Sequence, residues 1–112
     1  MNDLIQRITN AVFRQEGMPA DCYNPGNLRD APWLTRPVIE NGFWRPVSRA
    51  QGVAGAAHCV ALRIAEGQSL ARLISAWAPA SDNNNTSAYV QNVKLWAGIP
   101  DETVPLQNYI EL

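Results

Sequence analysis

Proline recurs at five positions between residues 19 and 46 and excludes a regular helix from this part of the chain. These prolines are Pro19, Pro25, Pro32, Pro37 and Pro46. Proline lacks a backbone N–H and fixes φ, so it ends helices and occurs in sheets mainly at edges. Asn41-Gly42 is typical of a two-residue hairpin turn, and Phe43-Trp44 follows it. We therefore expect a loop-rich segment with a small β-hairpin.

Apolar residues recur with helical spacing on both sides of this segment. The spacing predicts helices over about residues 3–16, from Ser48 to Gly67, from Ser69 to Pro79, and from a cap at Thr86 to Ala97. Small residues early in the second helix indicate that other helices approach it closely. The tail, residues 101–112, is expected to form a short turn of helix or an extended strap. The chain should thus be one α+β domain over residues 1–112, mainly α, with the hairpin region after the first helix.

The charge balance argues against a nucleic-acid partner. The chain has 112 residues, with nine Lys and Arg against ten Asp and Glu and a net charge of -1. Nucleic-acid-binding domains carry a basic patch that this composition does not supply. No apolar run approaches the roughly 20 residues that span a bilayer, and the N-terminus lacks the basic and apolar regions of a signal peptide. We expect neither a transmembrane segment nor a signal peptide.

Cysteine and histidine are too few for an ordinary metal site. Cys22, Cys59 and a single histidine fall short of the four N or S ligands of structural zinc. A disulfide between the cysteines stays open, although free thiols are favoured in a chain without a signal peptide. We expect no metal and no cofactor.

Glu16 is an acid where an apolar residue is expected. At roughly 100° per residue, it lies within about 20° of Ile5 and about 40° of Val12 around the first helix. Burial disfavours the charged form of a carboxyl group and raises its pKa, which is typical of a general acid. The alternative is that Glu16 turns outward at a fraying helix end. The surrounding loops bear on this choice.

Two asparagine-containing loops supply further candidate ligand-binding residues. In "CYNPGNLR", residues 22–29, Pro25-Gly26 forms a turn between two asparagines, and Asn27 is expected to offer amide groups to a ligand. In "WAPASDNNNTSAY", residues 77–89, three asparagines lie between Trp77 and Tyr89. Amides beside aromatic rings are typical of a sugar site. The alternatives are ordinary stable turns and, for Trp77, a core position.

These segments, in this order, resemble small lysozyme-like proteins of phages and prophages, a family that includes virion-associated lytic transglycosylases. "NGFWRPVSRAQGVAGAAHC" is similar to the middle segment of that family. The resemblance implies a minimal lysozyme-like fold that cleaves peptidoglycan between N-acetylmuramic acid and N-acetylglucosamine. It places the catalytic acid on Glu16 and implies two groups of substrate-binding residues. These are the loop residues Asn24, Gly26, Asn27 and Arg29 and the third-motif residues Trp77, Asn84, Asn85, Thr86 and Tyr89, of which Asn27, Asn85 and Tyr89 are expected to position the glycan. Asp82 stands where the family commonly has Glu.

The resemblance implies a reaction with Glu16 as the single acid and base. A hydrolytic muramidase is the alternative, and it needs a second carboxylate. The candidates for that carboxylate are Asp21, Asp30, Glu40 and Asp82. Two further alternatives lack catalysis: a virion component that only binds glycan strands, and a helical adaptor with Trp33 and Trp44 exposed to a partner.

The expected partners are peptidoglycan glycan strands and other virion proteins. We expect a monomer that is made in the host cytoplasm and is then associated with the virion or released to the cell wall. The near-zero net charge provides no long-range attraction to an anionic wall, so delivery by a larger assembly is expected.

Overall fold

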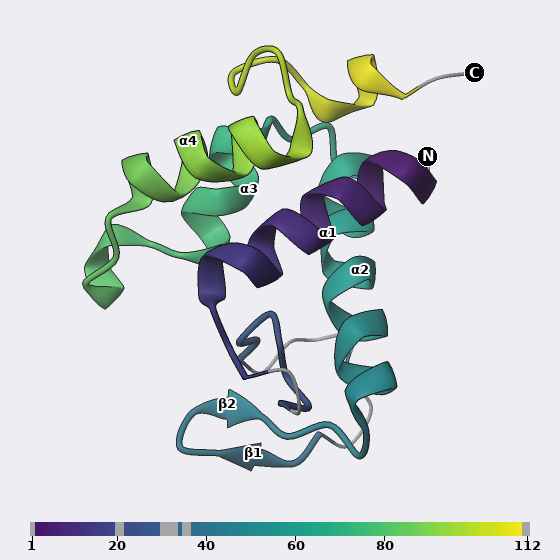
Figure 1. Ribbon diagram of the computed structural model, residues 1–112, viewed down its shortest axis with the longest axis vertical. Coiled ribbons are helices and arrows are strands. Elements are labelled where there is room, and N and C mark those ends of the chain that lie inside the picture. Colours follow the sequence, from purple (N-terminus) through teal and green to yellow (C-terminus); the bar gives the residue numbers. More distant parts are fainter. Residues whose placement is uncertain (1, 20–21, 30–33, 35–36, 111–112) are drawn as a thin grey trace.

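The computed structural model describes residues 2–19, 22–29, 34 and 37–110. Its helices and strands are α1 (Asn2–Glu16), β1 (Ile39–Glu40), β2 (Phe43–Trp44), α2 (Arg49–Ala65), α3 (Leu70–Trp77) and α4 (Thr86–Ala97), with short 3-10 helices η1 (Ala80–Asp82) and η2 (Leu106–Tyr109) (Figure 1). β1 and β2 pair antiparallel around the Asn41-Gly42 turn. The predicted mainly α fold, with a small hairpin region after the first helix, is confirmed.

One cluster of buried apolar side chains holds the helices together. α1 packs against both α2 and α4, and α3 packs against α4. The hairpin lies at the end of the molecule away from α4 and the C-terminal segment (Figure 1). Each fully buried aliphatic side chain contributes about 1.5–3 kcal/mol to folding. The cluster draws on α1 (Leu4, Ile8, Val12), α2 (Val60, Ile64), α3 (Leu70, Leu73, Ile74) and α4 (Val90, Val93).

Side-chain caps fix where three of the helices begin. Ser48 accepts a hydrogen bond from the Gln51 N–H at 3.1 Å, as the sequence predicts. Ser69 caps α3 in the same way. The prediction that Thr86 caps α4 is wrong: the cap is Asn85, whose Oδ1 accepts from the Ala88 N–H at 3.1 Å. Thr86 is the first helical residue, and its hydroxyl instead donates to the Ala78 carbonyl at 2.7 Å.

At Gly52, a small residue of α2, the segment that approaches closely is a loop and not a helix. A Cβ atom built on Gly52 would lie 1.7 Å from the backbone oxygen of Tyr23. The loop that follows α1 therefore rests directly on the first turns of α2. Only glycine, which has no Cβ atom, permits this approach. The presence of glycine at position 52 therefore determines where the loop can lie on α2.

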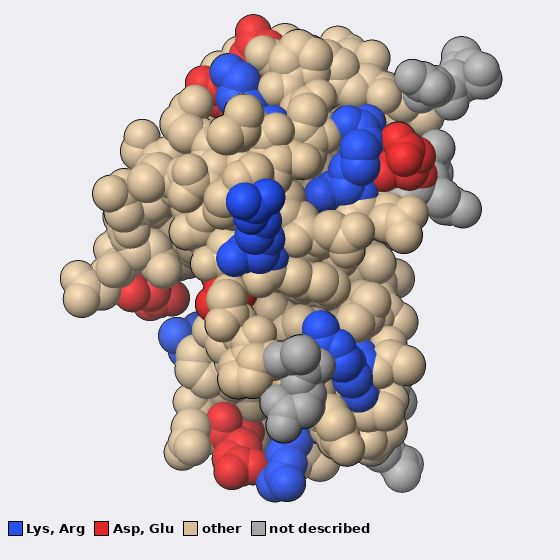
Figure 2. Space-filling model, in the orientation of Figure 1, with Lys and Arg blue, Asp and Glu red and all other residues tan. Residues whose placement is uncertain are grey.

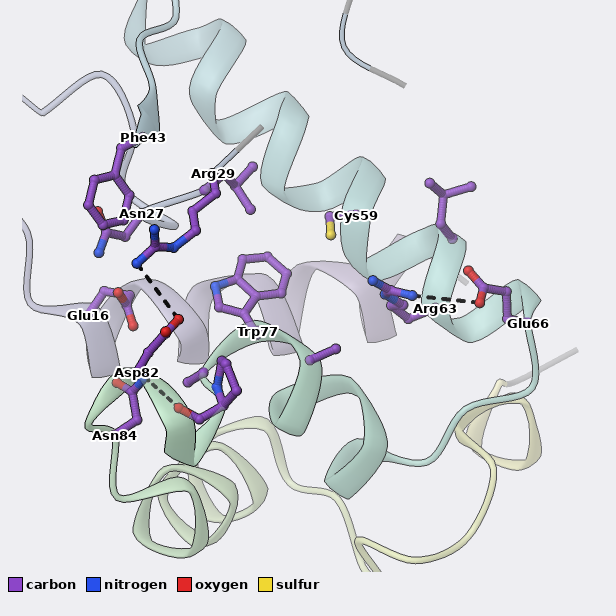
Figure 3. Close-up of a pocket in the computed structure, with 15 residues that line it drawn as sticks. Glu16, Asn27, Arg29, Phe43, Cys59, Arg63, Glu66, Trp77, Asp82 and Asn84 are labelled. Carbon is purple, nitrogen blue, oxygen red and sulfur yellow. Dashed lines mark hydrogen bonds and ion pairs between the residues drawn. The ribbon is translucent and has the colours of Figure 1, made fainter. Parts of the chain in front are cut away.

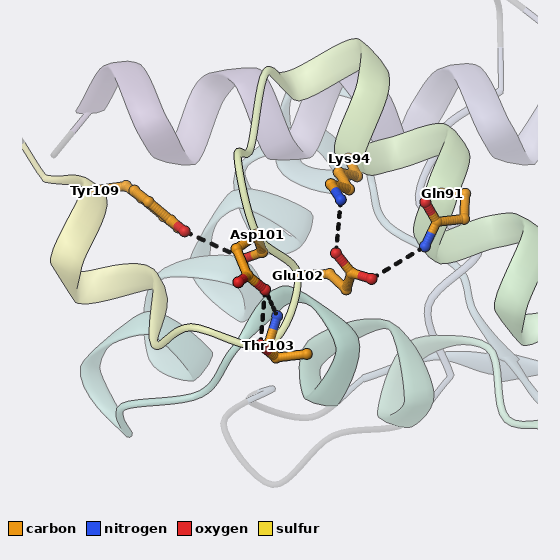
Figure 4. Close-up of polar contacts among 6 residues, drawn as sticks. All are labelled: Gln91, Lys94, Asp101, Glu102, Thr103 and Tyr109. Atoms are coloured by element: carbon orange, nitrogen blue, oxygen red, sulfur yellow. Dashed lines mark hydrogen bonds and ion pairs between the residues drawn. The ribbon is translucent and has the colours of Figure 1, made fainter.

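The C-terminal segment folds back over α4 and α3. The Lys94 ammonium lies 2.7 Å from the Glu102 carboxylate, which also accepts a hydrogen bond from the Gln91 side chain (Figure 4). The Glu102 carbonyl accepts from the Ala71 N–H at 2.9 Å. The side chain of Leu106 is fully buried. The C-terminal segment thus contains both an extended part and a short helical turn, which the sequence analysis gave as alternatives.

Three observations concern the exposure of Trp44, the distribution of charge and a possible membrane span. The alternative of an adaptor that exposes Trp33 and Trp44 to a partner finds no support at Trp44, which is 6% exposed, and Trp33 lies outside the described residues. On the face seen in Figure 2, Lys and Arg are dispersed among Asp, Glu and uncharged residues. Within the described ranges, no helix is long and apolar enough to cross a membrane.

Candidate active site

A cleft of about 810 Å³ is lined by residues from α1, the loop after it, β2, α2, α3 and η1. One end lies at the C-terminus of α1, beside the loop and the hairpin, and holds Glu16, Asn27 and Phe43 (Figure 3). Trp77 lies in the middle, and Arg63 lies at the opposite end. The cleft therefore joins parts of the chain that are far apart in sequence.

Glu16 lies at the wall of this cleft, as the last residue of α1. It is half-buried, and this loss of hydration raises the pKa of its carboxyl group above the ordinary value of 4.5. Hydrogen bonds from the side chains of Tyr89 and Asn27 act in the opposite direction without cancelling the effect of burial. Glu16 can therefore hold a proton at a higher pH than an exposed glutamate.

Tyr89, on α4, is a direct hydrogen-bond partner of Glu16. Its hydroxyl donates to Oε2 of Glu16 at 2.9 Å. Burial, together with the negative charge of Glu16, raises the pKa of the Tyr89 hydroxyl, so this group remains a donor. Tyr89 is 4% exposed and does not line the cleft. It acts on the site only through the carboxyl group.

The loop after α1 is held rigid by Asn24. This side chain is buried; its Oδ1 accepts from the Leu28 N–H at 3.0 Å, and its Nδ2 donates to the Leu28 carbonyl at 2.9 Å. Nδ2 also donates to the Trp44 carbonyl at 2.8 Å, which ties the loop to the hairpin. Asn24 is thus a support of the loop rather than part of the cleft lining.

Gly26 and Trp77 join the same loop to α3. The Trp77 indole N–H donates to the Gly26 carbonyl at 2.9 Å. A Cβ atom on Gly26 would lie 3.1 Å from both Ala56 Cβ and Trp77 Cζ2, so the loop packs closely on α2 and α3. Trp77 is half-buried and also lines the cleft, which combines the two roles that the sequence offered as alternatives. Asn27, next in the loop, has a φ of 52° and reaches Glu16.

Arg29 and Asp82 face each other across the cleft. Arg29 Nη2 lies 3.7 Å from Asp82 Oδ2, and both side chains line the cleft (Figure 3). The Arg29 guanidinium also lies 4.6 Å from the centre of the Phe43 ring. Phe43 was not predicted as a site residue, although its place just after the hairpin turn was visible in the sequence. The hairpin thus contributes an aromatic face to this end of the cleft.

The asparagines of the third motif separate into different positions. Asn84 lines the cleft, and its amide donates to the Pro79 carbonyl at 3.1 Å. Asn85 and Thr86 start α4 and do not belong to the lining. The structure therefore brings together five of the predicted residues along the cleft: Glu16, Asn27, Arg29, Trp77 and Asn84.

The other acids proposed for a hydrolytic reaction differ in position. Glu40 is exposed on β1, pairs with Arg45 at 2.7 Å, and lies outside the cleft lining. Asp21 and Asp30 lie outside the described residues. Asp82 alone of the described candidates shares the cleft with Glu16.

The far end of the cleft was not predicted from the sequence. It contains Cys59, Arg63 and Glu66, all from α2 or its C-terminal cap (Figure 3). Arg63 Nη1 lies 3.7 Å from Glu66 Oε2, and the Arg63 side chain also hydrogen-bonds to the thiol of Cys59. Burial raises the pKa of that thiol. Both Cys59 and Cys22 are free thiols.

Neither a metal-ligating cluster in the described part of the chain nor a similar known protein is found. Among the described side chains, no group of three or more His, Cys, Asp or Glu residues lies close enough together to hold a metal ion. Comparison of the chain with models of protein families, with curated proteins and with solved structures finds no match.

Proposed function

We propose that this protein is a lytic transglycosylase that cleaves the β-1,4 bond between N-acetylmuramic acid and N-acetylglucosamine in peptidoglycan. The observation that carries the proposal is Glu16, a half-buried carboxyl group with a raised pKa at the wall of a cleft. The order of the sequence motifs, which resembles that of small phage lysozyme-like proteins, supports the choice of substrate.

Glu16 is suited to protonate the glycosidic oxygen. Its raised pKa keeps a proton available at a higher pH than an exposed glutamate allows. As the bond from C1 of N-acetylmuramic acid to the bridging oxygen breaks, the proton moves to that oxygen and N-acetylglucosamine departs as an alcohol. Glu16 is left as a carboxylate. Tyr89 and Asn27, which hydrogen-bond to it, then stabilise the negative charge.

The same carboxylate completes the reaction as a base. It accepts the proton of the 6-hydroxyl of N-acetylmuramic acid while that oxygen forms a bond to C1. The product carries a 1,6-anhydro ring, and Glu16 regains its proton. One carboxyl group therefore performs both proton transfers without a second acid, and no water is consumed.

The lining of the cleft supports a carbohydrate ligand. Trp77 and Phe43 present aromatic rings, which pack against the apolar faces of sugars (Figure 3). Asn27 and Asn84 supply amide groups within the same cleft, and amides can both donate to and accept from hydroxyl and N-acetyl groups. Flat apolar faces beside amide groups suit glycans, and each of the two arginines of the cleft lies 3.7 Å from a carboxylate.

Hydrolysis by a muramidase is the second candidate, because Asp82 lines the same cleft as Glu16. Asp82 would then hold or activate a water molecule on the other face of the sugar. Its contact with Arg29 at 3.7 Å is an exposed ion pair and orients it only weakly. The two candidates differ in their products: transglycosylation leaves anhydro ends, and hydrolysis leaves reducing ends.

Clearing of purified peptidoglycan by the Glu16→Gln variant tests the proposal. Glutamine keeps the size of the side chain but can neither donate an acidic proton nor act as a base, so we expect turbidity to remain constant. Glu40→Gln, on the exposed hairpin strand, is the matched control and should clear as fast as the wild type. Undiminished clearing by Glu16→Gln would remove the assignment. Binding of peptidoglycan by the wild type without release of fragments would favour a non-catalytic glycan-binding protein.

A further inference from the structure

We infer that the Arg63 end of the cleft binds a carboxylate carried by the muramic acid units of the glycan, so that the protein selects acidic glycan strands over neutral ones. This inference rests on the proposed function, because it assumes that the glycan occupies the cleft. It concerns the end away from Glu16, which the proposed chemistry does not use (Figure 3).

The position of Arg63 is the first observation. Its side chain lines the cleft and is 35% exposed, so the guanidinium lies partly within the wall but remains accessible to a ligand. Trp77, in the middle of the cleft, lies between Arg63 and Glu16 (Figure 3). A strand that extends along the cleft from Glu16 past Trp77 therefore passes the guanidinium.

The second observation is that the present partners of Arg63 hold it weakly. The contact to Glu66 is 3.7 Å long, and the Glu66 side chain is 53% exposed. Ion pairs of this kind contribute about 0–1 kcal/mol in water. The other partner is the neutral thiol of Cys59. A guanidinium has five N–H donors in a planar fork that matches a carboxylate, so a ligand carboxylate can displace Glu66 or bind beside it.

The chemistry of the substrate supplies the matching group. N-acetylmuramic acid carries a lactyl carboxyl group, which is free in stripped strands and is joined to a peptide with its own carboxylates in intact strands. Strands built only from N-acetylglucosamine carry no carboxylate. Arg63 thus distinguishes acidic from neutral glycans of the same backbone, and Glu66 opposes the binding of the anion.

Binding to the catalytically silent Glu16→Gln protein tests the inference, with Trp fluorescence or calorimetry as the readout. The three probes are soluble peptidoglycan fragments with intact peptide stems, the same fragments with the stems removed by an amidase, and neutral chitin oligosaccharides of equal length. Adding Arg63→Met should weaken binding of acidic fragments about tenfold or more, the effect of losing a charge-assisted hydrogen bond. Adding Glu66→Gln should tighten it. Arg45→Met, on the exposed hairpin, is the control and should change the binding of neither the acidic fragments nor the chitin oligosaccharides.

The probes also identify the source of the carboxylate. A loss confined to stem-bearing fragments assigns the carboxylate to the peptide. A loss confined to the stem-free fragments assigns it to the lactyl group, because that group is an amide wherever a stem is attached, and a loss with both fragments means that Arg63 accepts either carboxylate. Unchanged binding of chitin oligosaccharides by Arg63→Met shows that the variant is folded. Equal binding of acidic fragments with and without Arg63, or binding of none of the probes, would overturn the inference.

Cleavage separates the inference from the function on which it rests. If the wild type degrades peptidoglycan but Arg63→Met has no effect on binding, the inference fails and the proposed function stands. If binding depends on Arg63 but the wild type cleaves nothing, the proposed enzyme fails and the carboxylate site stands.

Discussion

Gly52→Ala tests whether the loop that carries Asn27 is seated on α2. In a helix, replacing glycine with alanine ordinarily stabilises by roughly 0.5–1 kcal/mol. Here the new Cβ atom would lie 1.7 Å from the Tyr23 oxygen and 2.8 Å from the Tyr23 carbonyl carbon. Cβ atoms essentially never approach other atoms closer than 3.0 Å, so the helix and the loop backbone must separate. The structure therefore reverses the sign that helix propensity alone predicts.

The magnitude follows from two opposing contributions. Forcing extra volume into a packed contact costs about 1–3 kcal/mol, and because the clash is with backbone atoms we expect the upper part of this range. After subtraction of the gain in helix propensity, the net loss is about 1–2 kcal/mol. For a domain of this size, that loss lowers Tm by roughly 4–8 °C. The displaced loop should also carry Asn27 away from Glu16 and reduce clearing of peptidoglycan.

Thermal unfolding followed by circular dichroism measures this effect. Ala54→Gly, at an exposed position of the same helix, is the control that measures helix propensity without the contact, and it should cost about 1 kcal/mol. A Gly52→Ala protein with a higher Tm than the wild type would refute the close contact between the Tyr23 backbone and α2.

Three further changes test the site and its supports. Asn24→Ala should lower the free energy of unfolding in urea by about 1–3 kcal/mol, because backbone groups of the loop and hairpin lose their buried partner. Asn10→Ala, on the exposed face of α1, is the control and should change the free energy of unfolding by less than about 0.5 kcal/mol. Tyr89→Phe removes a hydrogen bond that lowers the pKa of Glu16, so the fall in activity with rising pH should shift to higher pH, and an unshifted profile would contradict the role of this contact. Glu16→Gln should stabilise the fold at neutral pH. Because the pKa of Glu16 is raised in the folded state, the wild type loses stability as pH rises above 4.5, and glutamine avoids this loss. The difference in stability between the two proteins should therefore vanish at low pH. A difference that is independent of pH would count against the burial of the carboxyl group.

The helices were predictable because their signals are local. Spacing of apolar residues and serine caps placed α2 and α3 correctly, and the Asn41-Gly42 turn placed the hairpin. The cap of α4 was not predicted correctly, because Asn85 and Thr86 both favour cap positions. The choice between them depends on the Ala78 carbonyl, which accepts the Thr86 hydroxyl after a chain reversal that the sequence does not specify.

The site was predictable only near Glu16. Its angular position on α1 continues the apolar stripe and so allows burial, but the sequence left open an outward turn at a fraying helix end. The structure, in which the side chain is half-buried, decides between the two. Phe43 and Arg63 lacked such a marker, because their place in the cleft results from packing between distant segments. The contact between Gly52 and the Tyr23 backbone is likewise long-range. Glycine in a helix indicates a close approach, but the sequence does not identify the approaching group.

The identity of the product ends tests the central claim most directly. Mass spectrometry of the fragments that the wild-type protein releases from purified peptidoglycan should find N-acetylmuramic acid ends in the 1,6-anhydro form, one water lighter than reducing ends. The Glu16→Gln protein should release none. Fragments with only reducing ends would contradict the single-carboxyl mechanism and favour Asp82 as a second acid, and any release by Glu16→Gln would contradict the role of Glu16 itself.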